Sequence, residues 1–278
     1  IDKVEIRRRN FIQPYQFPYN NEIIYQDFAP LTYDTGNYEA SLDKALDLIG
    51  YDAFYAEEQR VGRENGRYLG LGLVCYVEGT GIGPYEGARV QVQSNGHVSV
   101  ATGIGTQGQG HFTVFAQIVA DQVLGQLAQM ANPMRGAVKP GTEPGLESSN
   151  YFGPKYGATA NGVHAMIVEV DPDTMMLTIQ KYVIVHDCGP VINPLILDGQ
   201  IHGGVAQGIG NAFYEKLAYD DNGQLLSGSF MDYLLPTALD VPPMEMDHVV
   251  TEASLNPLGI KGAGEAGAIP VGPLFAQA

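Results

Sequence analysis

Two glycine-rich turns, each placed between a strand pattern and a helix pattern, limit the folds open to this chain. The first is residues 103–111, GIGTQGQGH, between an alternating stretch over 97–102 and a helical stretch over 112–124. The second covers residues 186–194, HDCGPVINP, between an apolar strand and a helix over 197–216. Glycine permits left-handed backbone angles, and amide groups at a helix start can face an anion. We therefore expect two strand-to-helix units, although their similarity is too loose for a sequence repeat.

Three glutamines accompany these units, with Gln107 and Gln109 in the first turn and Gln207 in the second helix. A primary amide both donates and accepts hydrogen bonds, so it suits oxo groups and heterocycle edges better than plain charge. The glycine spacing fits neither a Rossmann fingerprint nor a P-loop, and no lysine stands where a P-loop needs one. The first turn is thus a candidate phosphate or cofactor cradle. A glutamine-capped turn without a ligand is the alternative that the pattern leaves open.

A third glycine-rich stretch, residues 259–267, reads GIKGAGEAG and carries a single carboxylate, Glu265. Its neighbours are apolar or featureless, so burial would desolvate the carboxylate and raise its pKa toward that of a general base. On this hypothesis Glu265 lies in a dry crevice and faces Gln107 and Gln207, and exposure to open solvent would leave only a fold assignment. A mobile glycine loop with a solvated glutamate is the alternative.

The remaining periodicity predicts an α+β fold. Helical spacing favours helices over residues 38–49 and 53–65, and the charge order of residues 1–11 is typical of the end of a helix. Alternation and β-branched residues favour strands over residues 68–78, 88–93, 97–102, 161–170, 176–185 and 243–251. Proline- and glycine-rich sequence predicts irregular chain over residues 11–31 and 134–149, with a short helical segment over 126–131.

The net charge of −16 over 278 residues disfavours nucleic acid and anionic membranes as partners, because both would repel the chain. No run of 18 apolar residues and no signal peptide is present, which predicts a cytoplasmic protein without a membrane span. Cys75 and Cys188 lie far apart in apolar runs and are expected to be buried free thiols. Without a CxxC pair or dense His/Cys spacing, the chain is not expected to hold its own iron–sulfur cluster or zinc site.

Four motifs follow one another along the chain. They are QGQGH at 107–111, DCG at 187–189 with INP at 192–194, QIHGG at 200–204 with QG at 207–208, and KGAGE at 261–265. With VEGTGIGPYEGAR at 77–89, they resemble the molybdenum-binding large subunit of the xanthine oxidase family, of the carbon monoxide dehydrogenase or aldehyde oxidase type. The resemblance runs from about residue 2 to the end. One such motif would be weak, whereas four in order are a specific signal.

The resemblance implies the molybdenum cofactor-binding fold of that family, an α+β fold with mixed sheets, flanking helices and two strand-to-helix sub-units. It also implies a domain division. Residues 1–34 would be the end of the first cofactor domain and a connection, and residues 35–278 would form the second cofactor domain. The sub-units of this second domain would cover about residues 35–130 and 150–278.

The cofactor implied by the resemblance is molybdopterin with molybdenum, commonly as the cytosine dinucleotide in bacteria. The cofactor contacts would fall on a set of glutamines and glycines: Gln107, Gly108, Gln109, Gly110, Gln207 and Gly264. The proton-accepting base beside molybdenum would fall on Glu265. No residue of this chain is expected to be a metal ligand.

A subunit of this kind hydroxylates an electrophilic carbon of an aldehyde or N-heterocycle, or oxidises carbon monoxide, with water as the oxygen source. Its electrons pass to a 2Fe–2S subunit and a FAD-binding subunit, and the resemblance implies a dimer of such heterotrimers. The small-molecule substrate stays open. A non-catalytic scaffold subunit that retains the fold for association with partners is the alternative function.

The chain departs from the family pattern in its middle and at its start. Between residues 124 and 146 it is much shorter than the family, and Phe112 stands where many relatives have glutamate. The chain also begins at Ile1 rather than at a methionine. We expect a part of a longer polypeptide rather than a shortened relative, because cofactor loops without an opposing domain would leave a large apolar face open to water.

Overall fold

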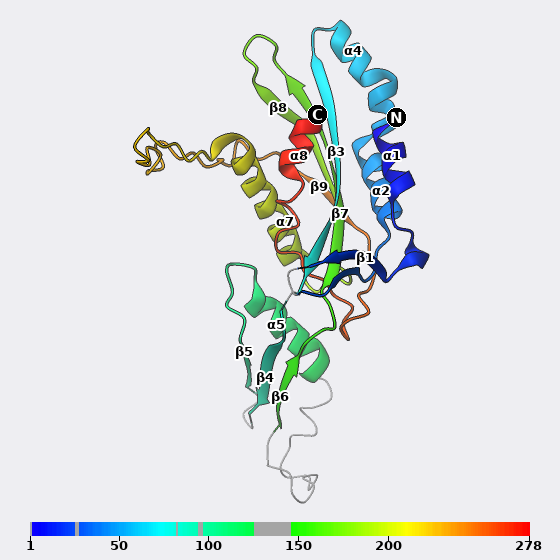
Figure 1. The fold of residues 1–278 in the computed structure, drawn as a ribbon, viewed down its shortest axis with the longest axis vertical. Helices are drawn as coiled ribbons and strands as arrows, with labels where there is room; N and C mark the ends of the chain where they lie inside the picture. Colours follow the sequence, from blue (N-terminus) through cyan, green and yellow to red (C-terminus); the bar gives the residue numbers. More distant parts are fainter. Residues whose placement is uncertain (1, 26–27, 82, 94–96, 125–145) are drawn as a thin grey trace, which may run out of the picture.

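The computed structural model describes residues 2–25, 28–81, 83–93, 97–124 and 146–278. Its centre is a four-stranded mixed sheet with the strand order β3-β7-β8-β9 (Figure 1). The strands are β3 (Tyr68–Thr80), β7 (Ala158–Val170), β8 (Leu177–Asp187) and β9 (Glu245–His248). β7 lies antiparallel to β3 over its whole length and antiparallel to β8, whereas β9 pairs with β8 in parallel. The glycine-rich turn at residues 186–194 therefore follows the end of a strand of this sheet, whereas the turn at residues 103–111 follows β5 (Val98–Thr102) of a second sheet.

Helices cover both faces of this sheet, which gives three layers (Figure 1). Helix α2 (Tyr38–Ile49) packs on one face, where Leu42, Leu71 and Val163 are buried in one core cluster. Helices α7 (Pro194–Ile209) and α8 (Val271–Gln277) cover the other face, where Met166 and Ile201 belong to a second cluster. Ten consecutive residues of β7, from Thr159 to Val168, are buried, because successive side chains enter opposite cores.

The helices begin and end where the local sequence predicts. Helix α1 (Lys3–Asn10) starts at Asp2, whose Oδ1 accepts hydrogen bonds from the amides of Val4 and Glu5 at 2.8 and 3.0 Å. Helix α2 starts after Asn37, whose side chain accepts from the Ala40 amide, and ends at Gly50 in the left-handed conformation. The chain then continues through α3 (Tyr51–Ala53), the π-helical turn η2 (Phe54–Glu58) and α4 (Gln59–Glu64).

A second sheet lies beyond the end of β3 and has the order β5-β4-β6 (Figure 1). It consists of β5 (Val98–Thr102), β4 (Glu86–Val92) and β6 (Leu146–Phe152). The prediction of irregular chain over residues 134–149 is wrong where β6 begins. Pairing with β4 and the Arg89–Glu147 ion pair at 2.7 Å stabilise this strand, and neither interaction can be predicted from the local sequence. The helical segment expected over residues 126–131 lies outside the described residues.

The N-terminal segment also contains more structure than its composition predicts. Residues 11–31 were expected to be an irregular connection. They include the 3-10 turn η1 (Pro14–Gln16) and strand β1 (Tyr19–Ile24), which pairs antiparallel with β2 (Pro30–Tyr33). The hairpin could not be predicted from periodicity, because β1 is mostly exposed and so has no alternating apolar face.

Most of the other sequence expectations are confirmed, including the α+β class, both early helices and the two long antiparallel strands β7 and β8. The strand expected over 243–251 is shorter and covers Glu245–His248. The helix expected over 197–216 starts at Pro194 and ends in the π-helical turn η5 (Gly210–Tyr214). The two expected sub-units stay a prediction, and the structure joins strands from both of them in one sheet through the β3–β7 pairing.

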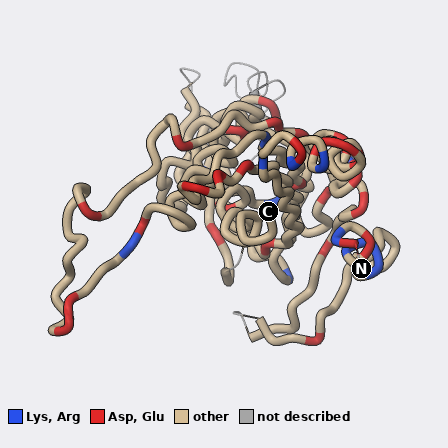
Figure 2. Tube along the Cα trace, turned by 90° about the horizontal axis from the view of Figure 1, so that it is seen from above, with Lys and Arg blue, Asp and Glu red and all other residues tan. Residues whose placement is uncertain are grey.

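Charge is distributed unevenly over the molecule. Figure 2 shows acidic residues on the body and along the extended arm that follows α7, whereas basic residues are fewer, in line with the net charge of −16. No helix in the described part of the chain is long and apolar enough to cross a membrane.

Two histidines lie in the core on the face of the sheet that α7 and α8 cover. His164 of β7 contacts the Tyr182 hydroxyl through Nδ1 at 3.0 Å, and His186 of β8 contacts the Tyr76 hydroxyl at 2.9 Å. Both rings are fully buried, and neither Nε2 has a partner among the described residues. Burial lowers the pKa of His164 to about 3 and that of His186 to about 4, so both are neutral in the folded protein at neutral pH.

These histidines should make the folded state sensitive to acid. The unfolded chain takes up protons below the ordinary histidine pKa of 6.5, whereas the folded chain does not until about pH 4. Stability is therefore lost as pH falls through this window, by about 2 kcal/mol per histidine between pH 8 and pH 5. His164→Gln should remove about one such contribution from the pH dependence of the urea-unfolding free energy. His202→Gln, at an exposed position on α7, is the control, and equal pH dependence in wild type and His164→Gln would contradict the assignment.

Candidate functional site

A buried ion pair joins the third glycine-rich loop to the end of β8. Lys261 Nζ lies 3.4 Å from Asp187 Oδ2, and both side chains are fully shielded from solvent. Lys261 Nζ also donates to Thr251 Oγ1 at 2.8 Å, and the Thr251 hydroxyl donates in turn to Asp187. Asp187 further accepts from Asn161 Nδ2 at 3.1 Å and from the Gly189 amide at 2.9 Å. One carboxylate thus ties together β7, the turn after β8 and the segment that leads into the glycine loop.

Backbone contacts hold the same loop against two neighbouring segments. The Lys261 amide donates to the Cys188 carbonyl at 2.8 Å, and the Gly262 amide donates to Thr80 Oγ1 at the end of β3 at 2.9 Å. Gly189 has a φ of +70°, and a Cβ there would lie only 2.2 Å from the Gly259 carbonyl oxygen. The close approach of two backbones therefore requires glycine at position 189.

The two strand-to-helix units meet through a pair of amide side chains. Gln117 of α5 (His111–Val119) donates through Nε2 to the Ile192 carbonyl at 2.9 Å, and Asn193 Nδ2 donates to Gln117 Oε1 at 3.0 Å. Asn193 also caps α7, since its Oδ1 accepts from the Ile196 amide at 3.1 Å. The start of α7 is consequently fixed against the side of α5.

A pocket of about 320 Å³ opens where these segments converge. Its lining comes from the first turn and α5, from the turn after β8, from α7 and from the glycine loop. Among the lining residues are Gln109, His111, Asn193, Gln200, Lys261 and Gly264. Residues more than 150 positions apart in the sequence therefore face one cavity.

The predicted residues of the first turn lie at this pocket or beside it. Gln109 lines the pocket, and its Oε1 accepts from the Gln107 amide at 2.6 Å, which fixes the loop conformation. Gln107 and Gly108 are exposed, and a Cβ at Gly108 would meet nothing within 4 Å. Gly110 occupies the N-cap position of α5 with a φ of +72°, and a Cβ there would lie 2.8 Å from the Ile196 side chain.

Gln207 is not at the pocket. It is exposed on α7, two turns beyond Gln200, which does line the pocket. Because residues seven positions apart share a helix face, Gln207 lies on the same face of α7 as Gln200, but two turns further along the helix and beyond the cavity. The glycines of α7 allow the following chain to pack closely against this helix. A Cβ at Gly204 would lie 2.8 Å from Gly267 Cα, and a Cβ at Gly208 would lie 2.5 Å from the Val271 side chain.

Glu265 does not occupy the dry crevice that the sequence hypothesis requires. It is exposed and is not part of the pocket lining, although Gly264 beside it is. The loop turns Ala266 and Gly267 inward against α7 and leaves Glu265 on the outer side. That expectation is therefore wrong for the described chain, and a different carboxylate, Glu78 of β3, lies partly buried nearby.

Both cysteines are free. Cys188 is buried and lines the pocket, and Cys75 is partly buried on β3. Burial raises the pKa of each thiol to about 11, so both are protonated and unreactive at neutral pH. In the described part of the chain, no three His, Cys, Asp or Glu side chains are grouped as metal ligands.

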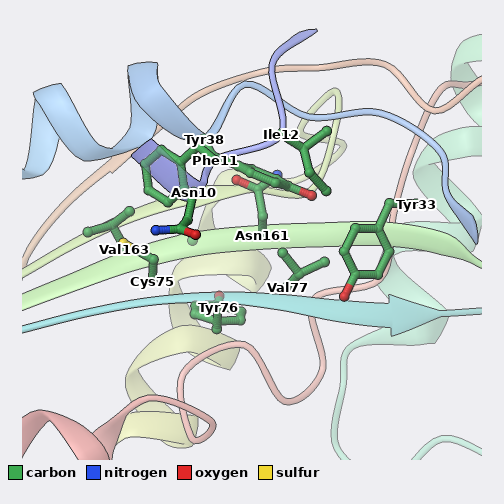
Figure 3. Close-up of a pocket in the computed structure, with 11 residues that line it drawn as sticks. Asn10, Phe11, Ile12, Tyr33, Tyr38, Cys75, Tyr76, Val77, Asn161 and Val163 are labelled. Carbon is green, nitrogen blue, oxygen red and sulfur yellow. The ribbon is translucent and has the colours of Figure 1, made fainter. Parts of the chain in front are cut away.

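A second cavity of about 250 Å³ lies on the α2 side of the central sheet. Figure 3 shows Val77 and Tyr33 side by side at this cavity, with Tyr76 on the other side of the β3 ribbon. Tyr38 also lines it, and its hydroxyl is buried without a partner among the described residues. None of the predicted cofactor residues contacts this cavity.

The 320 Å³ pocket has the chemistry that a polar heterocyclic cofactor with phosphate groups requires. Gln109 and Gln200 offer amide groups, and His111 Nδ1 is buried without a partner among the described residues. No side chain caps the start of α5, so the amides of its first turn remain open to an anion. Fold and pocket together define a cofactor-binding domain built around glycine turns.

The chain belongs to the molybdopterin cofactor-binding domain family, whose model matches residues 44–131 and 123–242. It is 28% identical to the carbon monoxide dehydrogenase large chain of Afipia carboxidovorans, over 100% of this chain and 45% of that protein. It is 30% identical to the nicotine 6-hydroxylase large subunit of Paenarthrobacter nicotinovorans, over 97% of this chain and 43% of that protein. The chain thus spans somewhat less than half the length of these relatives.

The fold is shared with solved structures of the same family. Quinoline 2-oxidoreductase from Pseudomonas putida 86 superposes with a TM-score of 0.87 at 29% identity, over 99% of this chain and 46% of that one. The expected fold of a molybdenum cofactor-binding domain of the xanthine oxidase family is therefore confirmed.

Sequence reasoning missed several residues that shape this site. Asp187 and Lys261 appeared within motifs, but their pairing across 74 positions left no local signal. Gln117 was not singled out and Gln200 appeared only as the first residue of the QIHGG motif, and a search for further amides near the two turns would have found both.

The buried ion pair should be necessary for folding. Lys261→Met keeps most of the side-chain volume but leaves the Asp187 carboxylate buried without its cation, which should cost about 3–5 kcal/mol of unfolding free energy. Asp187→Asn combined with Lys261→Met should cost less than the sum of the single changes, because the unpaired charge is gone.

The matched control for this experiment is Arg67→Met, which breaks the exposed Arg67–Glu169 pair. Urea denaturation should show almost no change for this control, since solvent already screens the pair. Equal shifts for Lys261→Met and Arg67→Met would show that the buried pair contributes nothing beyond a surface contact.

Proposed function

We propose that this chain is the cofactor-binding part of a molybdenum-containing oxidoreductase that hydroxylates an electrophilic carbon or oxidises carbon monoxide, with water as the oxygen source. The observation that carries the proposal is the single pocket shared by Gln109, Asn193 and Gly264. These residues come from three of the four motifs, and packing of distant chain segments has brought them together. The names of the relatives support the same class of activity.

The residues of the pocket would hold the cofactor by hydrogen bonds. The amides of Gln109 and Gln200 suit the edge of a pterin ring, and the open backbone amides at the start of α5 suit a phosphate group. Gly108 and Gly264 have no atoms within 4 Å of a potential Cβ, so a bulky ligand can approach the backbone there. The bound group supplies the redox centre of the reaction.

Glu265 is the proposed base. Lys261 and the Gly262–Thr80 hydrogen bond fix the start of the loop that carries it, three to four residues before the exposed carboxylate. Its carboxylate oxygen would accept the proton that the attacking water loses. Bound cofactor and the rest of the assembled protein would exclude water from this face, which would strengthen the base.

The finer assignments follow from the family resemblance. We propose the cytosine dinucleotide form of molybdopterin, with Gln107, Gly110 and Gln207 among its contacts. We further propose electron transfer to 2Fe–2S and FAD-binding subunits in a cytoplasmic dimer of heterotrimers. The domain division at residues 34 and 35 belongs to the same proposal. The relatives act on carbon monoxide and on nicotine by name, so the substrate class stays open.

One observation favours the second candidate, a scaffold subunit without catalysis. Glu265, Gln107 and Gln207 are all exposed rather than gathered in one crevice. A scaffold would bind its partner subunits and contain no cofactor. Metal analysis and the ultraviolet spectrum of the released pterin distinguish the enzyme from the scaffold. Both are measured on the complex purified with its partners. Absence of both molybdenum and pterin would overturn the enzymatic proposal.

Glu265→Gln should separate catalysis from cofactor binding. The amide keeps the size of the side chain but cannot accept the proton, so turnover should fall by about three or more orders of magnitude while molybdenum and pterin contents stay near wild type. Steady-state kinetics with metal analysis measure both quantities. Glu57→Gln, at an exposed position on η2, is the control. A Glu265→Gln variant with wild-type turnover would refute the base assignment.

Gln109→Ala should weaken cofactor retention. It removes an amide from the pocket and the acceptor for the Gln107 amide, so the purified complex should contain several-fold less pterin. Gln91→Ala, which removes a half-buried amide of β4 that donates to Glu147 and lies outside the pocket lining, should leave the pterin content unchanged. Equal pterin contents in the two variants would exclude Gln109 from the binding site.

A further inference from the structure

The chain between η5 and β9, residues 215–244, forms an arm that projects from the body of the molecule. Figure 1 shows this arm extending beyond α7, away from the central sheet and from α2. Within the arm, the Leu226 amide donates to the Ala218 carbonyl at 2.8 Å, so two of its segments run side by side as a short hairpin. Among the described residues of the arm, none lines the 320 Å³ pocket. The proposed cofactor site therefore gives the arm no task.

Hydrogen bonds within the arm occupy its polar groups and fix its base. The Tyr214 hydroxyl donates to Asp240 Oδ1 at 2.9 Å, and the Tyr233 hydroxyl donates to Glu215. These two contacts join the outgoing and the returning chain. Asp240 Oδ2 also accepts from the amide and the hydroxyl of Thr237 at 2.6 and 2.7 Å. The arm thus has a defined shape of its own.

Large apolar side chains of the same arm face solvent. Those that are more than half exposed are Leu217, Tyr219, Leu226, Phe230, Met231 and Leu239. Single exposed apolar residues are ordinary on a protein surface, whereas a group of them on one projecting segment indicates an interaction surface. Because the polar groups bond within the arm and the apolar groups point outward, the arm is suited to contact with another polypeptide.

The charge of the arm distinguishes the surfaces that could cover it. Lys216 is the one basic residue in the sequence 215–244. The five carboxylates of this segment are Glu215, Asp220, Asp221, Asp232 and Asp240. Figure 2 shows acidic residues along the arm. A second copy of this chain would approach with a net charge of −16, and two arms side by side would bring their carboxylates together. The charge therefore disfavours self-association and favours a partner that is basic around an apolar groove.

We propose that residues 215–244 are a docking arm for a separate subunit, whose surface has an apolar groove edged by lysine and arginine side chains. Side chains such as Met231 and Leu239 enter the groove, where their apolar surface leaves water. Carboxylates such as Asp221 face the basic edge, which orients the encounter of the two subunits. The identification of this partner with one of the subunits of the proposed function rests on that proposal, whereas the docking arm does not. A scaffold without catalysis would use the same arm.

Met231→Ser combined with Leu239→Ser tests the apolar part of the arm. Their side chains are 86% and 97% exposed, so the double variant should keep the circular dichroism spectrum of wild type. Its association constant for the partner subunits should fall by about tenfold or more, as measured by sedimentation velocity over a dilution series of the purified complex. Met175→Ser combined with Met176→Ser, on exposed methionines between β7 and β8, is the matched control and should assemble like wild type. Unchanged association of the arm variant would overturn the proposal.

Asp221→Lys tests the charged part of the arm. Asp221 is exposed, and reversal of its charge should weaken association several-fold at about 0.05 M salt. The difference from wild type should disappear at about 0.5 M salt, because exposed charges are then screened. Asp173→Lys, at an exposed position between β7 and β8, is the control and should have no effect. Association that is unchanged or stronger in Asp221→Lys would show that the covering surface is not basic, and would overturn the proposed partner.

A photoreactive benzophenone amino acid at position 231 identifies the molecule that covers the arm. In the purified complex it should cross-link to a different subunit, at a peptide that contains lysine or arginine beside apolar residues. The same group at position 176 should give no such product. A cross-link to a second copy of this chain, a cross-link to another part of the same chain, or no cross-link would overturn the proposal. This measurement decides the matter even if the serine variants do not fold.

The outcomes separate the docking arm from the proposed function. A complex that contains neither molybdenum nor pterin overturns the enzymatic proposal, while the assembly and cross-linking results still decide whether the arm docks. Wild-type assembly of the arm variants overturns the docking arm even where the cofactor content is that of an active enzyme.

Discussion

The site depends on one buried carboxylate. Asp187 accepts hydrogen bonds from Asn161 and Thr251 and pairs with Lys261, so three distant segments must be in place before its charge is compensated. A buried charge without these partners would cost several kcal/mol. The end of β8, the start of β7 and the glycine loop are therefore positioned together or not at all. The contact of Asp187 with Lys261 therefore determines where the glycine loop, with its candidate functional residues, begins.

Glycine has two distinct tasks in this molecule. At Gly189, Gly204 and Gly267 it permits backbones to approach closely, because a Cβ at any of them would collide with a neighbouring main chain. At Gly108 and Gly264 a Cβ would meet nothing within 4 Å, so close packing explains neither glycine, although the φ of +96° at Gly108 is a left-handed backbone angle that favours glycine. The first group holds the segments that line the pocket in close contact behind it. The second group leaves room along its rim, which is where a flat cofactor would need the backbone exposed.

Local periodicity was sufficient to predict elements such as α2 and β7, because their buried residues repeat with the helical or strand period. β6 could not be predicted, since its partner β4 lies more than 50 residues away and its own sequence is polar. The motifs identified Gln109 and Gly264 as site residues. The burial of Glu78 and the exposure of Glu265 depend on how the loop meets β3, and no feature of either segment alone specifies that contact.

The exposed groups of the site indicate what kind of surface should cover them. Gln107, Gln207 and Glu265 are polar and face solvent, whereas an apolar docking face would present leucine or phenylalanine side chains at these positions. Burial of such groups is favourable only if the covering molecule supplies hydrogen-bond donors, acceptors and a compensating charge. A polar heterocycle with phosphate groups meets the first requirement, and a cationic centre near Glu265 would meet the second. At these positions the chain thus presents polar groups, beside the exposed side chains of Phe112 and Leu195, rather than a finished crevice.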